Sequence, residues 1–245
     1  MGLMARKTAS RKQVTSTEPR LRRLRLFLRR WLLRGGLIVL GATVLVVGLF
    51  TVVNPPTTPY MFSESSRLDG VDHTWVPLEE IAPVMARAAV AAEDADYCLH
   101  WGLDLSAIRA AMNDGTGRGG STISQQTVKN VYLWQGRSWF RKSLEALLTP
   151  VVEAAWTKRR ILEVYLNVAE FDEGVFGVEA AAVHYFGVQA RDLTPTQAAR
   201  LAAVLPDPKG RSAAQPSSFV RSRAASILDG AATIRKDGRA DCFED

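Results

Sequence analysis

The hydropathy pattern of the 245-residue chain is dominated by an apolar run at residues 35–53, in which none of the 19 side chains is charged. As a helix rising ~1.5 Å per residue, this run would be ~28 Å long, close to the hydrocarbon thickness of a bilayer. A buried core helix of that length normally carries polar side chains, and a cleaved signal peptide has a shorter apolar run followed by a small-residue cleavage site. The pattern therefore predicts a transmembrane helix that stays attached as a signal anchor.

Behind the anchor the pattern changes. Residues 54–66 contain three prolines and are predicted to form an extended linker. Apolar side chains at positions 81, 84, 85 and 88 recur with helical spacing and predict a helix over 81–94.

A second helix start is marked by Thr194 and Gln197, which stand in capping-box relation around Pro195. This helix should end at Leu205, because a proline follows. Long alternating strands and internal repeats are absent from the sequence, so the fold class expected is all-α. We expect the main domain over 67–215 and a helical extension over 216–245.

Charge is distributed unevenly along the chain. The formal net charge is +6, of which residues 1–34 carry +10 and residues 35–245 carry −4. By the positive-inside rule, the basic arm 1–34 stays in the cytoplasm and the rest is exported. A mitochondrial transit peptide is the competing interpretation, which the long apolar run disfavours. Because the basic residues lie on an arm and not on the body, no nucleic-acid partner is expected.

Cysteine and histidine are sparse. Cys98 and Cys242 are the only cysteines, and neither belongs to a CxxC pair, so a bridge between them stays an open alternative. The three histidines are scattered without ligand spacing, and no zinc site is expected.

The first candidate for chemistry is the pair Glu93-Asp94, at the end of the predicted apolar helix. The negative end of the helix dipole and an apolar wall both raise the pKa of such a carboxyl group. A raised pKa suits a general acid or base. An ordinary solvated helix end is the competing interpretation.

Further along, a glycine-rich stretch at 115–120 precedes Thr122 and Gln125, which have capping-box spacing. A helix start of this kind can bind an anion through its backbone N–H groups, although the glycines are equally typical of a mobile loop. Arg141 and Glu145 are four residues apart, as in an ordinary surface ion pair.

The order of these segments is more specific than any of them alone. The stretches EDADYCLHWGLD at 93–104, GGSTISQQTVKN at 119–130, RKSLE at 141–145, ILEVYLN at 161–167 and EFDEGVFGVEAA at 170–181 resemble the successive motifs of the peptidoglycan glycosyltransferases, glycosyltransferase family 51. The resemblance extends over about 66–215. It departs from the usual pattern at Tyr97, where Phe is expected, and at Cys98, in a variable slot.

The resemblance implies a lysozyme-like all-α glycosyltransferase domain with a small membrane-proximal subdomain. It implies polymerisation of lipid II into glycan strands, with inversion at the anomeric carbon. Glu93 would be the general base and Glu145 the second essential carboxylate. The substrate would be bound by Asp94, Ser121, Gln125, Lys129, Asn130, Arg137, Arg141 and Lys142. Glu163, Tyr165 and Asn167 are expected to be mainly architectural.

The same resemblance implies lipid II, the growing glycan chain and the bilayer as partners, with other cell-wall synthesis proteins as candidates. It names no obligatory cofactor and leaves open a divalent cation, Mg²⁺ or Mn²⁺, at Glu145. The expected location is the bacterial inner membrane, with the catalytic domain in the periplasm. Apolar groups between Pro55 and Trp75 are expected to dip into the membrane.

Two alternatives remain at this stage: a lytic, lysozyme-like hydrolase and an inactive membrane scaffold. A penicillin-binding transpeptidase activity is not expected, because none of the seven lysines has a serine three positions before it.

Overall fold

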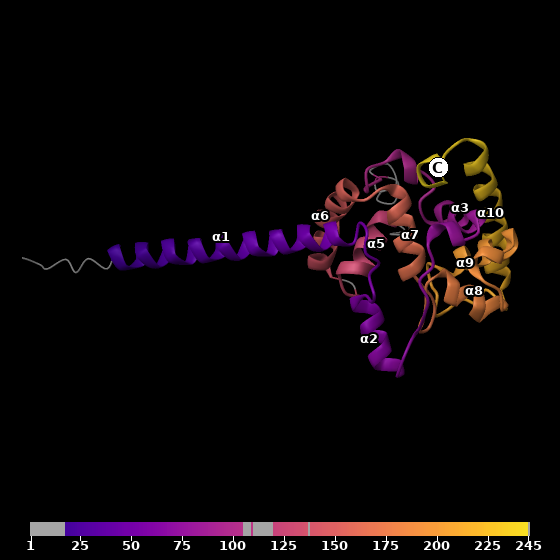
Figure 1. The fold of residues 1–245 in the computed structure, drawn as a ribbon, viewed down its shortest axis with the longest axis horizontal. Coiled ribbons are helices and arrows are strands. Elements are labelled where there is room, and N and C mark those ends of the chain that lie inside the picture. The colour runs from indigo at the N-terminus through magenta and orange to yellow at the C-terminus, as the bar shows by residue number, and fades with distance from the viewer. Residues whose placement is uncertain (1–17, 105–108, 110–119, 137, 245) are drawn as a thin grey trace, which may run out of the picture. The chain divides into compact units, whose positions relative to one another are not determined.

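The computed structural model describes residues 18–104, 109, 120–136 and 138–244. The chain divides into two compact units, Met1–Val46 and Val47–Asp245. Most of the first is helix α1 (Glu18–Leu49), which begins within the basic arm. Figure 1 shows α1 as one continuous helix. The expected helical content of the body is confirmed, because its main elements are helices.

Helix α1 is a single-pass membrane anchor by length and composition. Its residues Arg22–Leu49 are long and apolar enough to cross a bilayer, and no other helix in the described ranges passes the same test. The apolar side chains are exposed, with Leu37 67%, Ile38 72% and Leu45 73% accessible. A helix with so long an exposed apolar surface is stable in the hydrocarbon of a bilayer, whereas in water the same surface would be unfavourably hydrated.

The segment expected to be a linker contains a helix instead of remaining extended. Helix α2 spans Pro59–Leu68, and the Thr58 side chain accepts a hydrogen bond from the Met61 N–H at 3.1 Å. Proline at the first helical position has its φ angle preset for a helix and lacks only an N–H that would be unpaired there. Pro59 therefore starts a helix, whereas Pro55 and Pro56 precede it.

The remaining helices form the body, with helix starts that the sequence explains. The predicted helices at 81–94 and 194–205 are confirmed as α3 and α9, and both capping-box hydrogen bonds at Thr194 are present. The full set is α3 (Pro83–Glu93), α5 (Ile123–Tyr132), α6 (Trp139–Ala155), α7 (Lys158–Val168), α8 (Val178–Phe186), α9 (Pro195–Val204), α10 (Ser218–Lys236) and α11 (Asp241–Glu244), with short 3₁₀ turns η1 (Leu78–Glu80), η2 (Tyr97–Leu99) and η3 (Ala190–Asp192).

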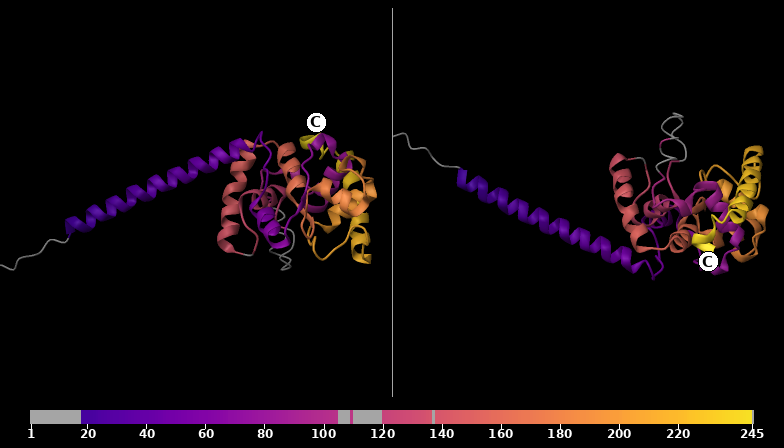
Figure 2. Two further views of the ribbon diagram at one scale, coloured as in Figure 1. Left: turned by 60° about the horizontal axis from the view of Figure 1, so that its bottom comes forward. Right: turned by 90° about the horizontal axis from the view of Figure 1, so that it is seen from above.

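Two groups of helices share one hydrophobic core. Helix α3 packs against α9 and α10, and α5 packs against α6 and α7. Figures 1 and 2 show α10 along the outer side of the body, next to α9. Met85 of α3, Ile161 of α7 and Leu201 of α9 are fully buried, so the apolar faces of three separate helices meet. The carboxyl end of α3 is thereby held next to the start of α5.

A small sheet completes the body. Strands β1 (Asp72–His73), β2 (Glu170–Asp172) and β3 (Val175–Phe176) lie in the order β1-β3-β2, with β1 parallel and β2 antiparallel to β3. The strands are two or three residues long, which agrees with the absence of long alternating patterns.

The two cysteines, whose pairing the sequence leaves open, form a disulfide. Cys98 of η2 and Cys242 of α11 are bonded, with Cα atoms 5.7 Å apart and a sequence separation of 144. The bridge ties the carboxyl-terminal helix to the turn that follows α3.

Candidate active site

Glu93 is the last residue of α3 and faces a cavity of about 330 Å³ that Ser121 and Arg223 also line. Gln126 Nε2 of α5 donates a hydrogen bond to Glu93 Oε2 at 2.8 Å. Burial raises the pKa of the Glu93 carboxyl group, and the nearby Asp94 raises it further, while the Gln126 hydrogen bond and the charges of Arg223 and Lys129 oppose the shift. The interpretation of Glu93 as a solvated helix end is therefore disfavoured.

Asp94, in contrast, is occupied by protein partners on both oxygens. Its Oδ2 accepts the backbone N–H of Ile123 at 2.9 Å, and its Oδ1 lies 2.7 Å from His100 Nε2. The carboxylate is buried and ties the end of α3 to the first turn of α5. These contacts favour a positioning role for Asp94 beside Glu93 over direct contact with a sugar.

Close packing explains why a glycine stands at position 102, in the first motif. Gly102 has a φ of +81°, and a Cβ there would lie 2.7 Å from Thr149 Cγ2 and 2.8 Å from Glu153 Cγ. Its carbonyl oxygen accepts the Thr122 hydroxyl at 2.6 Å. A side chain at 102 would displace the chain from the start of α5.

Glu145 and its neighbours form a buried charge cluster on α6. The Glu145 side chain is 2% exposed, and its two oxygens accept Arg141 Nη1, at 2.7 Å, and Lys142 Nζ. Lys142 Nζ also donates to Ser121 Oγ at 2.8 Å. The interpretation of Arg141 and Glu145 as an ordinary surface pair is wrong, because the carboxylate is almost fully inside the protein.

Lys129 lies on α5 between the two carboxylates. Burial lowers the pKa of its ammonium group, and the Glu145 charge offsets part of that shift. Arg141 and Lys142 lower the pKa further, whereas Glu93 raises it. Within the described ranges, no carboxylate lies within ion-pair distance of Lys129 Nζ, so its charge is available to a ligand.

The other predicted binding residues fall into three groups. Gln125 is buried in the capping box of α5, where its Oε1 accepts the Thr122 N–H at 3.1 Å. Asn130 Oδ1 accepts Gln135 Nε2 at 3.4 Å. Arg137 and most of the glycine-rich stretch 115–120 lie outside the described residues.

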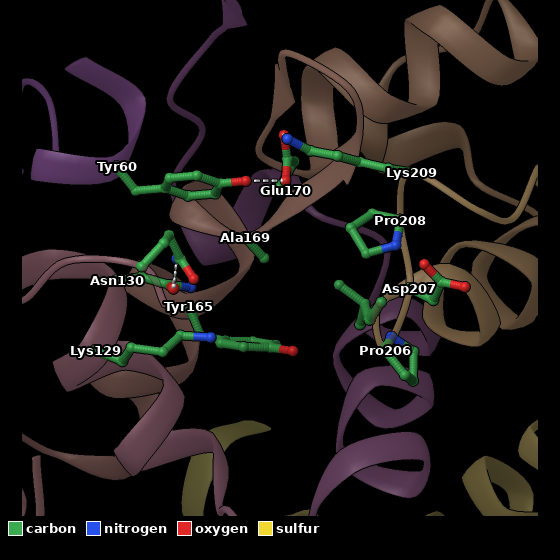
Figure 3. A pocket seen from close by; sticks show the side chains of 12 residues that line it. Tyr60, Lys129, Asn130, Tyr165, Ala169, Glu170, Pro206, Asp207, Pro208 and Lys209 are labelled. Carbon is green, nitrogen blue, oxygen red and sulfur yellow. Dashed lines mark hydrogen bonds and ion pairs between the residues drawn. The ribbon is translucent and has the colours of Figure 1, made fainter. Parts of the chain in front are cut away.

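Lys129 lines a second cavity, of about 370 Å³ (Figure 3). Lys129, Asn130 and Tyr165 line one wall. Pro206, Asp207 and Pro208 lie opposite them, and Tyr60, Glu170 and Lys209 also border the cavity.

Three of these residues were missed from the sequence: Tyr60, Glu170 and Lys209. Tyr60 Oη donates to Glu170 Oε2 at 2.5 Å, and Lys209 Nζ lies 3.5 Å from Glu170 Oε1 and 2.8 Å from Glu64 Oε2. Glu170 is the first residue of the motif at 170–181, so the sequence contained a signal for it. Lys209 is a single lysine in a proline-rich turn, and no local pattern marks it.

The geometry agrees with the comparisons to known proteins. A family model described as Transglycosylase matches residues 62–232, from inside α2 to inside α10. The chain belongs to the transglycosylase family. It is 63% identical over 217 residues to a protein of Jannaschia sp., covering 88% of this chain and 90% of that protein.

Two further relatives are more distant. A Pseudomonas fluorescens protein is 50% identical over 214 residues, covering 83% of this chain and 89% of its own. A Caulobacter vibrioides protein is 45% identical over 223 residues, covering 89% and 97%. All three relatives bear the name biosynthetic peptidoglycan transglycosylase. The family expected from the motifs is confirmed, and the chain is a glycosyltransferase.

Within this transglycosylase domain, Glu163 and Asn167 are architectural, as expected. Glu163 Oε2 accepts the Leu78 N–H at 3.3 Å, and Asn167 bonds both backbone groups of Val76, accepting at 2.9 Å and donating at 2.8 Å. Tyr165 differs from them, because its hydroxyl donates to Gln126 Oε1 at 3.5 Å while Gln126 donates to Glu93. Tyr165 therefore supports Glu93 through Gln126, and it also lines the second cavity.

A divalent cation does not fit the described donor set of the transglycosylase. Both Glu145 oxygens are occupied by cationic side chains. No cluster of three or more His, Cys, Asp or Glu side chains in the described ranges could hold a metal ion.

Proposed function

We propose that this transglycosylase polymerises lipid II, with Glu93 as the general base and the cluster around Lys129 stabilising the departing pyrophosphate. The observation that carries the proposal is that the Lys129 ammonium group lies within electrostatic range of two groups: the half-buried Glu93 carboxyl group, whose pKa is raised, and the cations that pair with the buried Glu145. Such an arrangement supplies a proton acceptor and an anion site close to each other.

The proposed step is a single displacement. The 4-hydroxyl oxygen of the acceptor GlcNAc attacks the anomeric carbon of the donor glycan, and its proton passes to a Glu93 oxygen. The bond from the anomeric carbon to the pyrophosphate oxygen breaks, and the electron pair leaves with undecaprenyl pyrophosphate. Attack from the face opposite the leaving group inverts the anomeric centre, so no covalent enzyme intermediate is needed.

The cations have distinct tasks in this step. Lys129 supplies a positive charge where negative charge develops on the leaving oxygen. Arg141 and Lys142 are oriented by Glu145, which fixes their charged ends before the substrate arrives. Fixed charges need no reorganisation during the reaction, so they lower the barrier more than solvated ones do.

The proposed location is the inner membrane, with the body in the periplasm and residues 1–34 in the cytoplasm. Arginines crowd the amino-terminal flank of the apolar run, as the positive-inside rule requires. The Cys98–Cys242 disulfide independently supports an oxidising compartment for the body. A lipid-linked substrate and an anchored enzyme then share one surface, which raises their effective concentration. Contacts with other cell-wall synthesis proteins stay a prediction.

Incubation of the purified chain with lipid II tests the proposal. We expect glycan polymer from the native protein and a loss of about 10²–10⁴ in rate for Glu93→Gln. The matched control is Glu80→Gln, which removes an exposed carboxylate in η1. Cleavage of finished glycan without polymer formation would instead establish the hydrolase alternative.

A further inference from the structure

The carboxyl-terminal helices hold the chain segment that contains the proposed base. Arg223 of α10 donates to the Ala92 carbonyl at 2.9 Å, one residue before Glu93. Arg239, between α10 and α11, donates to the Ala95 carbonyl at 3.0 Å. Three residues further along, Cys98 is bonded to Cys242.

The same segment is held from its other side by α5. Asp94 accepts the Ile123 N–H, and the Gly102 carbonyl accepts the Thr122 hydroxyl. Residues 92–102 are therefore fastened between the start of α5 and the last two helices. Glu93 lies in this segment, so its burial and its orientation depend on the attachments to α5 and to the carboxyl-terminal helices.

The attachment made by α11 combines the covalent bond with noncovalent contacts. This helix has four residues, which is too short to be stable alone. Its noncovalent contacts to the body include Glu244 to Arg87 at 2.5 Å and the Phe243 carbonyl to Arg159 at 2.9 Å. Phe243 also packs beside Tyr97 of η2, with ring centroids 6.3 Å apart.

We propose that the Cys98–Cys242 disulfide is a positioning element for Glu93, so that full polymerisation activity requires oxidation of this cysteine pair. The inference rests on the proposed role of Glu93. Oxidation converts the two thiols into one disulfide. The two electrons and two protons reduce the disulfide of an exchange partner, such as oxidised glutathione, to two thiols. Both cysteines are half-buried, so a small reagent reaches them.

The test compares three forms of the full chain in detergent: oxidised wild type, wild type reduced with dithiothreitol, and the double variant Cys98→Ser/Cys242→Ser. We expect kcat to fall about tenfold in the reduced and double-variant forms, with KM for lipid II changed less than about twofold. Oxidised glutathione should restore the reduced wild type and leave the double variant unchanged. Dithiothreitol should have no effect on the double variant.

A pH profile separates positioning from stability. The charged groups that face Glu93 are Asp94, Lys129 and Arg223, and neither cysteine is among them. A loosened segment admits water to Glu93, so the acid limb of the kcat profile should move to lower pH. A bridge that contributes only to global stability would leave that limb in place.

The proposal is overturned by unchanged kcat and an unchanged acid limb in a double variant with no disulfide. It is also overturned if reduction destroys the far-UV ellipticity at every temperature, because the bridge is then a requirement of the fold. Assays are therefore run where the ellipticity of the reduced and oxidised forms is the same. Activity of Glu93→Gln would contradict the proposed function, whereas equal activity of oxidised and reduced wild type contradicts this inference alone.

Discussion

At the scale of single residues, the site depends on two side chains whose burial shifts their pKa values in opposite directions. Burial disfavours the charged form of each, so the pKa of the Glu93 carboxyl group rises and that of the Lys129 ammonium group falls. In the proposed reaction both roles gain from this, because proton transfer and charge stabilisation are more effective in poorly solvated surroundings.

The Glu93 shift predicts the acid limb of the pH profile. A base works only when it is deprotonated, so activity is lost as the pH falls through the raised pKa. We therefore expect the acid limb of kcat/KM for lipid II above the ordinary glutamate value of about 4.3. An acid limb at or below that value, measured in a buffer series at constant ionic strength, would show that Glu93 is not the group titrated.

The Lys129 charge predicts a second effect. Lys129→Ala should reduce kcat by about 10²–10³, because a charge beside the leaving oxygen is removed. Lys129→Arg keeps the charge and should retain more activity than the alanine variant. The matched control, Lys236→Ala, changes an exposed lysine at the end of α10. Equal rates for Lys129→Ala and the control would exclude Lys129 from the reaction.

At the scale of elements, the site lies where the end of α3 meets the starts of α5 and α6. Helix periodicity and capping residues were sufficient to predict α3 and α9. The same rules also explain α2, because Thr58 and Pro59 form a good helix start. The three prolines of residues 54–66 predict an extended linker instead, and that prediction is wrong for the residues of α2. The burial of Glu145 was not predictable, because an i, i+4 pair has the same spacing on a buried helix face and on a solvated one.

The Glu145 cluster predicts a stability effect at this scale. Glu145→Gln leaves Arg141 and Lys142 without a counter-charge. We expect a loss of about 2–4 kcal/mol in the free energy of unfolding, less than the ~3–5 kcal/mol for a fully buried pair because Lys142 is 40% exposed. Glu79→Gln, which breaks the exposed pair with Arg159, should cost about 0–1 kcal/mol. Urea unfolding of both variants measures the difference, and equal losses would contradict the buried cluster.

At the scale of the whole molecule, a single-pass anchor precedes a helical body that a disulfide closes. Apolar length and arginine placement predicted the anchor from sequence alone. The disulfide and the second cavity could not be predicted, because each brings together residues far apart in the chain: Cys98 with Cys242, and Lys129 with Lys209. Local patterns carry no information about such pairs.

The long loop closed by the disulfide predicts its contribution to stability. With a separation of 144 residues, chain entropy gives about 4–5 kcal/mol in the free energy of unfolding. Denaturant unfolding with and without reductant measures this quantity. A difference below about 1 kcal/mol would mean that the reduced, unfolded chain keeps structure around these cysteines.

The central claim is that this transglycosylase builds glycan from lipid II with Glu93 as its base. The most direct test is the amount and length of polymer formed from lipid II by native protein and by Glu93→Gln, both verified as folded by far-UV circular dichroism. We predict polymer from the native protein and a trace at most from the variant. Equal polymer from both would contradict the role of Glu93, and no polymer from the folded native protein would contradict the function itself.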